Sequence, residues 1–176
     1  MSSFTIADLR PFIRDVPDFP KPGILFKDIT PMLGDAKAFS GCLDLLAKEI
    51  AIYRPAYLAG IESRGFIFAS ALAQKLGLGF VPMRKPGKLP WKTRRQSYAL
   101  EYGTDAIEVH EDAVPNGARV AVVDDLLATG GTANAAIQLL RGCGAEVVVA
   151  AFAIELGFLK GREKLELPNI ISLLTY

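Results

Sequence analysis

The chain has 176 residues, a length typical of one domain that buries its core without disulfides. Hydrophobic residues make up 51% of it and charged residues 22%, a balance that excludes a disordered chain and a fibrous repeat. The 20 Lys and Arg residues nearly cancel the 19 Asp and Glu residues, so no global positive field exists to attract nucleic acid or an anionic membrane. Any anion must therefore be bound locally.

The cysteines and the apolar runs indicate the compartment. Cys42 and Cys143 lack the spacing of a metal clip and the density of a secreted disulfide framework. The longest apolar run, residues 147–154, is far shorter than the roughly 18 to 20 residues that span a bilayer. The first residues also lack a basic segment followed by an apolar one. We therefore expect a cytoplasmic protein that makes no use of a membrane.

The first part of the chain predicts two helices around an irregular segment. Residues 6–13 predict a short helix. Residues 19–31 carry large apolar side chains among prolines and a glycine, which predicts an ordered segment without regular structure. From Asp35 to Ile50, apolar residues recur every three or four positions, which predicts a helix that ends at Arg54-Pro55.

The rest of the chain alternates strands and helices. Strands are predicted at residues 56–61, 79–84, 119–124, 146–155 and 170–176, and helices at residues 65–76 and 132–141. Between them, residues 85–95 predict a basic loop, and residues 97–102 and 107–110 predict a hairpin joined near Gly103. The alternation predicts one α/β domain, residues 1–176, built on a doubly wound, mostly parallel sheet with helices on both faces. Ligands of such sheets bind beyond the carboxyl ends of the strands.

The strongest chemical signal is an apolar strand that ends in two carboxylates and a glycine loop. Residues 120–132 read Val-Ala-Val-Val-Asp-Asp-Leu-Leu-Ala-Thr-Gly-Gly-Thr. Gly130 and Gly131 let the backbone approach an anion closely, and the free N–H groups of a helix start favour a phosphate. Thr129 and Thr132 add hydroxyl donors. The segment lacks the Lys and the spacing of a Walker loop and the glycine pattern of a dinucleotide fold, so it predicts a monophosphate site.

The acidic pair Asp124 and Asp125 precedes this loop at a distance that suits ribose hydroxyls. Carboxylates accept hydrogen bonds from vicinal hydroxyls, hold hydrated Mg²⁺ and stabilise positive charge that develops at a sugar carbon. An isolated Asp pair more often does no more than end a strand. Joined to the glycine loop, the pair favours a ligand-binding function.

Residues 120–132 resemble the signature with which the type I phosphoribosyltransferase family binds phosphoribosyl pyrophosphate (PRPP). Residues 19–31, 59–66, 84–90 and 98–103 look like segments of the family members that act on adenine. The resemblance covers nearly the whole chain. It implies the fold of that family, with a small N-terminal hood at about residues 1–34, a core at about residues 35–176 and a flexible catalytic loop within residues 85–95. One position departs, because Glu62 stands where the family commonly has Asp.

The resemblance also implies a reaction and its site residues. The reaction is transfer of the ribose 5-phosphate unit of PRPP to adenine, giving AMP and pyrophosphate in purine salvage. Mg²⁺ would be bound mainly through PRPP, with Asp124 and Asp125 as candidate ligands. The residues assigned to PRPP are Ser63, Lys88, Asp124, Asp125, Ala128, Thr129, Gly130, Gly131 and Thr132. Arg64 and Lys85 are assigned to the pyrophosphate and to catalysis, and Leu25, Phe26, Lys27 and Tyr102 to adenine. A homodimer is expected, and a cis peptide before Ser63.

The remaining catalytic candidate is Glu101. Attack by N9 of the purine is helped when a carboxylic acid protonates N7, so we expect Glu101 to be that general acid. The alternative is a salt-bridged surface Glu on a hairpin.

Two other functions remain open at this level. One is transfer to another base, such as a 6-oxopurine or orotate, which only the base pocket distinguishes. The other is a non-catalytic PRPP or purine sensor, which the absence of an added DNA-binding domain disfavours. Trp91 in the basic loop is a weak signal for nucleic acid. His110 has no partner with ligand spacing, so we expect a surface residue and no metal ligand.

Overall fold

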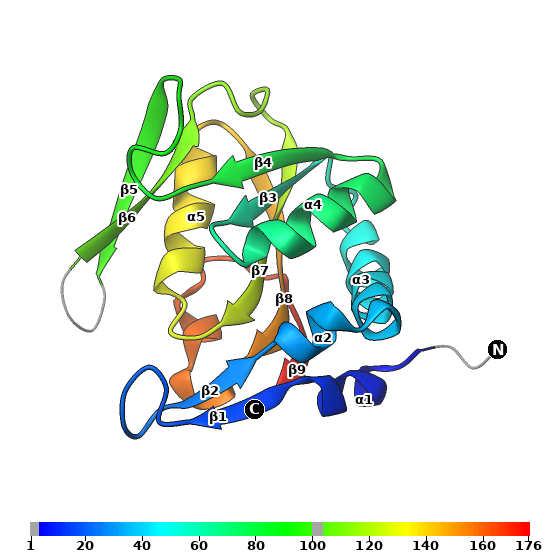
Figure 1. Cartoon of the computed structure of the whole chain (residues 1–176). Coiled ribbons are helices and arrows are strands. Elements are labelled where there is room, and N and C mark those ends of the chain that lie inside the picture. Colours follow the sequence, from blue (N-terminus) through cyan, green and yellow to red (C-terminus); the bar gives the residue numbers. More distant parts are fainter. Residues whose placement is uncertain (1–3, 100–103) are drawn as a thin grey trace. The chain divides into compact units, whose positions relative to one another are not determined.

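A computed structural model describes residues 4–99 and 104–176 of the chain (Figure 1). The chain divides into two compact units, Met1–Leu45 and Leu46–Tyr176, and its folding as one domain stays a prediction. Within the described residues, every helix is too short or too polar to cross a bilayer.

The first unit consists of short helices and one hairpin. Its elements are α1 (Ile6–Leu9), the 3₁₀ turn η1 (Arg10–Phe12), β1 (Arg14–Pro17), β2 (Leu25–Asp28), α2 (Thr30–Gly34) and the first part of α3 (Ala36–Ala51). Asp35 accepts a hydrogen bond from the Ala38 amide at 2.8 Å, as a residue does that caps a helix. The predicted apolar face of α3 is buried, and burial raises the pKa of the Cys42 thiol to about 12.

The prediction of an irregular segment at residues 19–31 is wrong in its second half. There β2 pairs antiparallel with β1, and α2 begins at Thr30. The register places Arg14 opposite Asp28 and Asp15 opposite Lys27, and each pair forms an ion pair at 2.6 Å. Opposite charges on facing strand residues stabilise a sheet, so these pairs were the available signal. The prolines and Gly23 outweighed this signal for a strand, because such residues indicate loops.

The second unit is built on a five-stranded parallel sheet in the order β4-β3-β7-β8-β9. The strands are β3 (Tyr57–Ile61), β4 (Gly79–Met83), β7 (Arg119–Leu127), β8 (Glu146–Glu155) and β9 (Ile170–Thr175). All of β8 except Glu146 is buried, which confirms the central strand expected from its apolar sequence.

Among the described residues, the helices α4 and α5 pack against this sheet. From β3 the chain passes through α4 (Gly65–Leu76) to β4, and from β7 it passes through α5 (Gly131–Gly142) to β8. These crossovers run in opposite directions along the sheet, and because parallel crossovers are right-handed they place α4 and α5 on opposite faces (Figure 1). The doubly wound architecture is thereby confirmed.

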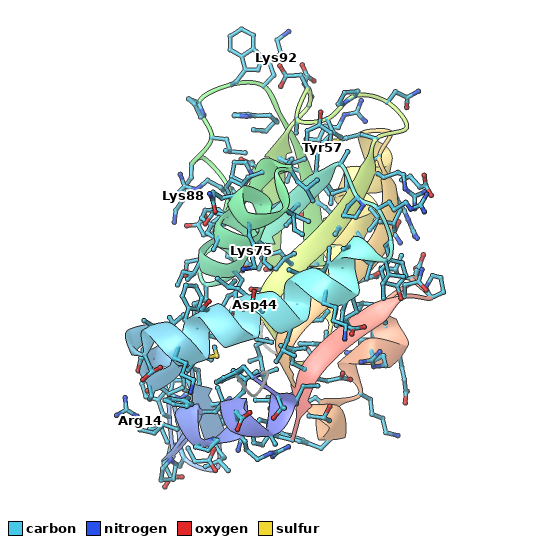
Figure 2. The ribbon with its side chains drawn as sticks, turned by 90° about the vertical axis from the view of Figure 1, so that its right-hand side faces the viewer. Arg14, Asp44, Tyr57, Lys75, Lys88 and Lys92 are labelled. Atoms are coloured by element: carbon cyan, nitrogen blue, oxygen red, sulfur yellow. The ribbon has the colours of Figure 1, made fainter. Side chains whose placement is uncertain are left out.

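A separate antiparallel hairpin contains β5 (Thr93–Ala99) and β6 (Thr104–His110). The basic loop was predicted to extend through Arg95, but β5 begins at Thr93 because residues 93–95 pair in register with residues 108–110. The loop therefore covers residues 85–92, and Lys92 projects away from the ribbon (Figure 2). Two short 3₁₀ turns, η2 (Gly157–Leu159) and η3 (Gly161–Lys164), connect β8 to β9 and were not predicted.

Candidate active site

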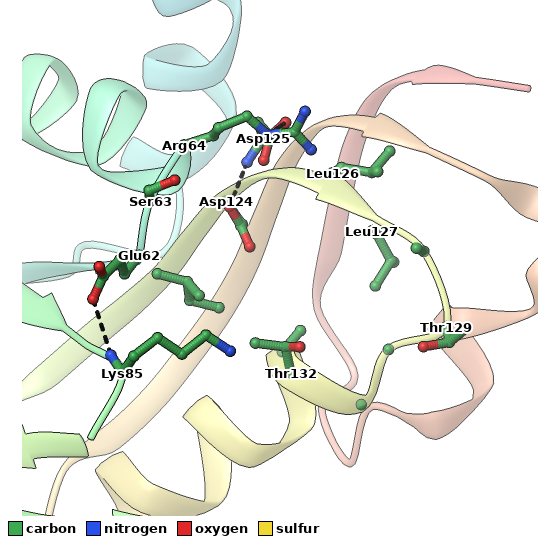
Figure 3. Close-up of a pocket in the computed structure, with 15 residues that line it drawn as sticks. Glu62, Ser63, Arg64, Lys85, Asp124, Asp125, Leu126, Leu127, Thr129 and Thr132 are labelled. Atoms are coloured by element: carbon green, nitrogen blue, oxygen red, sulfur yellow. Dashed lines mark hydrogen bonds and ion pairs between the residues drawn. The ribbon is translucent and has the colours of Figure 1, made fainter. Parts of the chain in front are cut away.

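A cavity of about 350 Å³ opens at the carboxyl ends of β3 and β7 (Figure 3). From β3 the chain goes outward to β4, and from β7 it goes outward in the other direction to β8 and β9. Such a reversal of strand order leaves a crevice where α/β proteins bind ligands. The cavity is lined by residues 61–64, Lys85 and residues 124–133. It thus contains Ser63, Arg64, Lys85, both aspartates and all of the predicted phosphate loop.

The phosphate loop has the conformation that an anion site requires. β7 ends at Leu127, and α5 begins at Gly131. Gly130 precedes α5 with φ +81°, a left-handed conformation that glycine adopts at little cost. The first N–H groups of a helix have no partner within it, so they are available to a phosphate, and the helix dipole adds to the attraction. Thr129 and Thr132 also line the cavity (Figure 3).

The acidic pair lies inside β7, whereas the strand was predicted to end at this pair. β7 continues three residues past Asp124, with Asp124 opposite Phe152 of β8 and Leu126 opposite Ile154. Because side chains alternate along a strand, the two carboxylates point to different sides (Figure 3). Asp125 is buried and forms an ion pair with Arg64 Nε at 2.9 Å, while Asp124 Oδ1 accepts the Asp125 amide at 2.9 Å.

Burial shapes the charge of this pair. It raises the pKa of Asp124, and the negative charge of Asp125 raises it further. Burial also raises the pKa of Asp125, although the Arg64 guanidinium opposes the change. The start of α4 packs closely on Asp124, because a Cβ at Gly65 would lie 2.7 Å from Asp124 Oδ1. Glycine at position 65 is therefore part of how the carboxylate is placed.

Glu62 organises the basic loop, a role that sequence reasoning missed. The Glu62–Ser63 peptide is cis, as the resemblance implied. The Glu62 carboxylate accepts hydrogen bonds from Lys88 Nζ at 2.5 Å, from the Lys85 amide at 2.9 Å and from Arg84 Nε at 3.3 Å. Burial alone would raise the pKa of Glu62, but these donors outweigh it and lower the pKa to about 2. The only sequence signal was the basic residues of the loop.

Lys85 reaches the cavity from the start of that loop. Its ammonium donates to Asp105 and, at 2.9 Å, to the Tyr98 hydroxyl, both on the β5–β6 hairpin. Burial lowers the pKa of Lys85, but the bonds to Asp105 and Tyr98 outweigh it and raise the pKa, so the side chain stays charged. Each predicted cation of the site thus already has a carboxylate partner: Arg64 has Asp125, Lys85 has Asp105 and Lys88 has Glu62.

Several predicted site residues do not line this cavity. Lys88 is absent from its lining. Leu25, Phe26 and Lys27 belong to β2 of the first unit, where Leu25 is exposed and Lys27 is buried. Glu101 and Tyr102 lie outside the described residues, so their roles stay predictions. His110, predicted on the surface, is half-buried at the end of β6, next to the core residue Val109.

A parallel sheet with an acidic pair and a glycine–threonine phosphate loop at its crevice defines the phosphoribosyltransferase class. The sequence model of the phosphoribosyl transferase domain matches residues 35–169. An adenine phosphoribosyltransferase of Syntrophotalea carbinolica is 56% identical over 96% of this chain and 99% of that protein. One of Rhodospirillum rubrum is 59% identical over 96% of this chain and 98% of that protein.

Solved structures agree with the sequence relatives. The adenine phosphoribosyltransferase of Thermoanaerobacter pseudethanolicus superposes with a TM-score of 0.95 at 52% identity, over 98% of this chain and 100% of that one. That of Saccharomyces cerevisiae, solved with adenine and an imino-altritol bisphosphate, gives a TM-score of 0.90 at 39% identity, over 96% of this chain and 97% of that one. The chain therefore belongs to the adenine phosphoribosyltransferase family.

Proposed function

We propose that this chain transfers the ribose 5-phosphate unit of PRPP to adenine, giving AMP and pyrophosphate in purine salvage. The observation that carries the proposal is the phosphate loop at residues 128–132, which lies at the start of α5 in the same cavity as Asp124 and Arg64. Relatives that match this chain over nearly their full length are named for this activity. The chain is accordingly a pentosyltransferase.

The phosphate loop and β7 hold the sugar. Backbone N–H groups of residues 128–132 and the hydroxyls of Thr129 and Thr132 bind the 5-phosphate. Asp124 accepts hydrogen bonds from the ribose hydroxyls and stabilises positive charge at the anomeric carbon, because its carboxylate faces the cavity. The ion pair with Asp125 holds Arg64 beside the sugar. Binding the sugar at both ends aligns the anomeric carbon for attack.

The leaving pyrophosphate is met by Ser63, Arg64 and Lys85, with Lys88 near the rim. Because all three cations have carboxylate partners, they neutralise only part of the charge that leaves. A further cation is therefore needed.

The cavity suits Mg²⁺ that arrives on PRPP. In the described residues no cluster of three or more His, Cys, Asp or Glu side chains could hold a metal by itself. Asp124 offers the hard oxygen that Mg²⁺ prefers, and phosphate oxygens and water supply the rest. Bound Mg²⁺ would neutralise the leaving group. Arg64 and Lys85 would orient the pyrophosphate by hydrogen bonds, and Asp124 would orient the metal's water shell.

The base is bound by residues predicted from the sequence. Glu101 protonates N7 of adenine as N9 attacks, and Tyr102 contacts the base. Leu25 and Lys27 read the edge of adenine through their backbone, and Phe26 covers its ring. The Lys27 side chain is buried and bonded to Asp15, so replacing it costs stability in the first unit without changing the base preference.

We extend the proposal to a homodimer in the cytoplasm, by the family resemblance. The near-zero net charge supports a protein with small-molecule substrates and no nucleic-acid partner. The reaction is tested by incubating the purified protein with adenine, PRPP and Mg²⁺. AMP and pyrophosphate formed in equal amounts support the proposal, whereas pyrophosphate release without AMP contradicts it.

A further inference from the structure

The connection between β8 and β9 lies directly against the phosphate loop. Gly161, the first residue of η3, is buried and faces Ala128 and Gly130. A Cβ on Gly161 would lie 2.9 Å from the Gly130 nitrogen and closer still to the Ala128 carbonyl oxygen. A Cβ on Gly130 would lie 3.0 Å from the Gly161 carbonyl carbon and closer still to its oxygen. The two backbones touch with no room for a methyl group on either side.

The atoms that such a methyl group would meet are backbone atoms of the phosphate loop. A flexible side chain moves aside at little cost, but a backbone moves only with the N–H groups attached to it. The loop has little freedom to retreat, because β7 before it is paired with β8 and Gly130 N-caps α5 after it. A side chain at position 161 would therefore displace the donors that hold the phosphate.

The connection itself is firmly anchored. Leu156 donates its amide to the Leu127 carbonyl at 2.9 Å, beside the end of β7. Arg162 forms a fork on Glu155, with Nη2 at 2.6 Å and Nε at 3.1 Å, and its other donors reach the Ile170 carbonyl at 2.8 Å and the Ser172 hydroxyl at 3.1 Å. The Glu155 carboxylate is buried, and the hydrogen bond from Arg162 lowers its pKa. Arg162, the residue after Gly161, is thus bonded to both β8 and β9, and this fixes the position of Gly161.

We propose that Gly161 is a positioning residue for the 5-phosphate. The backbone of Gly161, held by the anchored connection, packs against residues 128–130. This contact fixes the direction of the loop N–H groups. The inference rests on the proposed function, since it assumes that this loop binds the phosphate of PRPP and AMP. Gly161 touches no substrate, and it acts only through the loop.

The test compares AMP with adenosine, which lacks only the phosphate. Their dissociation constants are measured by calorimetry for the parent protein, for Gly161→Ala and for Gly142→Ala. Gly142 is a matched control, because it ends α5 and a Cβ there meets nothing within 4 Å. We expect Gly161→Ala to reduce the preference for AMP over adenosine at least fivefold, with adenosine affinity within twofold of the parent. Gly142→Ala should leave the preference unchanged.

A reduction of less than fivefold in Gly161→Ala, or an equal reduction in Gly142→Ala, overturns the inference. If Gly161→Ala does not fold, the same threshold applies to Arg162→Lys, which keeps the charge on Glu155 but loses the fork and its links to β9. A parent protein without preference for AMP contradicts the proposed function instead, so the two failures are distinguishable.

Discussion

Glu62→Gln tests whether one half-buried carboxylate organises the loop that carries Lys85 and Lys88. The substitution keeps the shape of the side chain and removes its charge. Lowering the pKa of Glu62 from 4.5 to about 2 corresponds to at most about 3.4 kcal/mol of free energy of unfolding. The side chains of Arg84 and Lys88 are 34% and 49% exposed, so solvent screens both partners and about 1–2 kcal/mol is the realistic loss.

That loss corresponds to a melting temperature about 3 to 6 °C below the parent at pH 7 for a chain of this size. Because folding lowers the pKa of Glu62, its stabilisation is complete above pH 4.5 and disappears as the pH falls through about 2. Calorimetric melts from pH 7 downward should therefore show the difference between parent and variant shrinking below pH 4.5. Glu111→Gln, at an exposed position, controls for loss of one negative charge. A Glu62→Gln melting temperature within 1 °C of the parent at pH 7 would refute the reasoning.

Three further predictions concern the reaction. Glu101→Gln should lower kcat about a hundredfold or more with PRPP affinity intact, because only the proton donor to N7 is lost; a kcat within threefold of the parent would remove Glu101 from the chemistry. Excess EDTA should abolish turnover, since Arg64, Lys85 and Lys88 are already paired with carboxylates, and full activity in EDTA would contradict the metal assignment. Asp124→Asn removes a buried charge, so it should increase the free energy of unfolding at pH 7 by about 1–2 kcal/mol and raise the melting temperature, while lowering kcat/KM for PRPP. Because folding raises the pKa of Asp124, this gain shrinks as the pH falls through the raised pKa and is gone below 3.8. A lower melting temperature at pH 7 would contradict the prediction.

The sequence predicted the parts of the fold whose signals are local. β8 coincides with the predicted residues 146–155, because every position after Glu146 is buried and apolar residues stand on both faces. α4 coincides with residues 65–76, where Gly77 ends the helix with φ +67°. The phosphate loop was equally predictable, since the strand, the glycines and the helix start are contiguous in the chain.

Features that depend on distant pairing were not predictable. β2 pairs with β1, whose signal in the sequence was masked by prolines and Gly23, and β7 continues past Asp124 where it pairs with β8. The partners of Lys85 lie 13 and 20 residues away on a hairpin, and Gly161 meets the phosphate loop only in the folded chain. The residues near each position in the sequence do not predict such contacts.

The base preference of the purified enzyme tests the central claim most directly. Steady-state kcat/KM is measured with saturating PRPP and Mg²⁺ for adenine, hypoxanthine and guanine. Adenine has a donor at N6 and an acceptor at N1, and 6-oxopurines have the reverse. Each buried mismatch costs roughly 1–3 kcal/mol, so we predict that adenine is preferred by at least about a hundredfold. Comparable turnover of hypoxanthine and adenine would contradict the assignment.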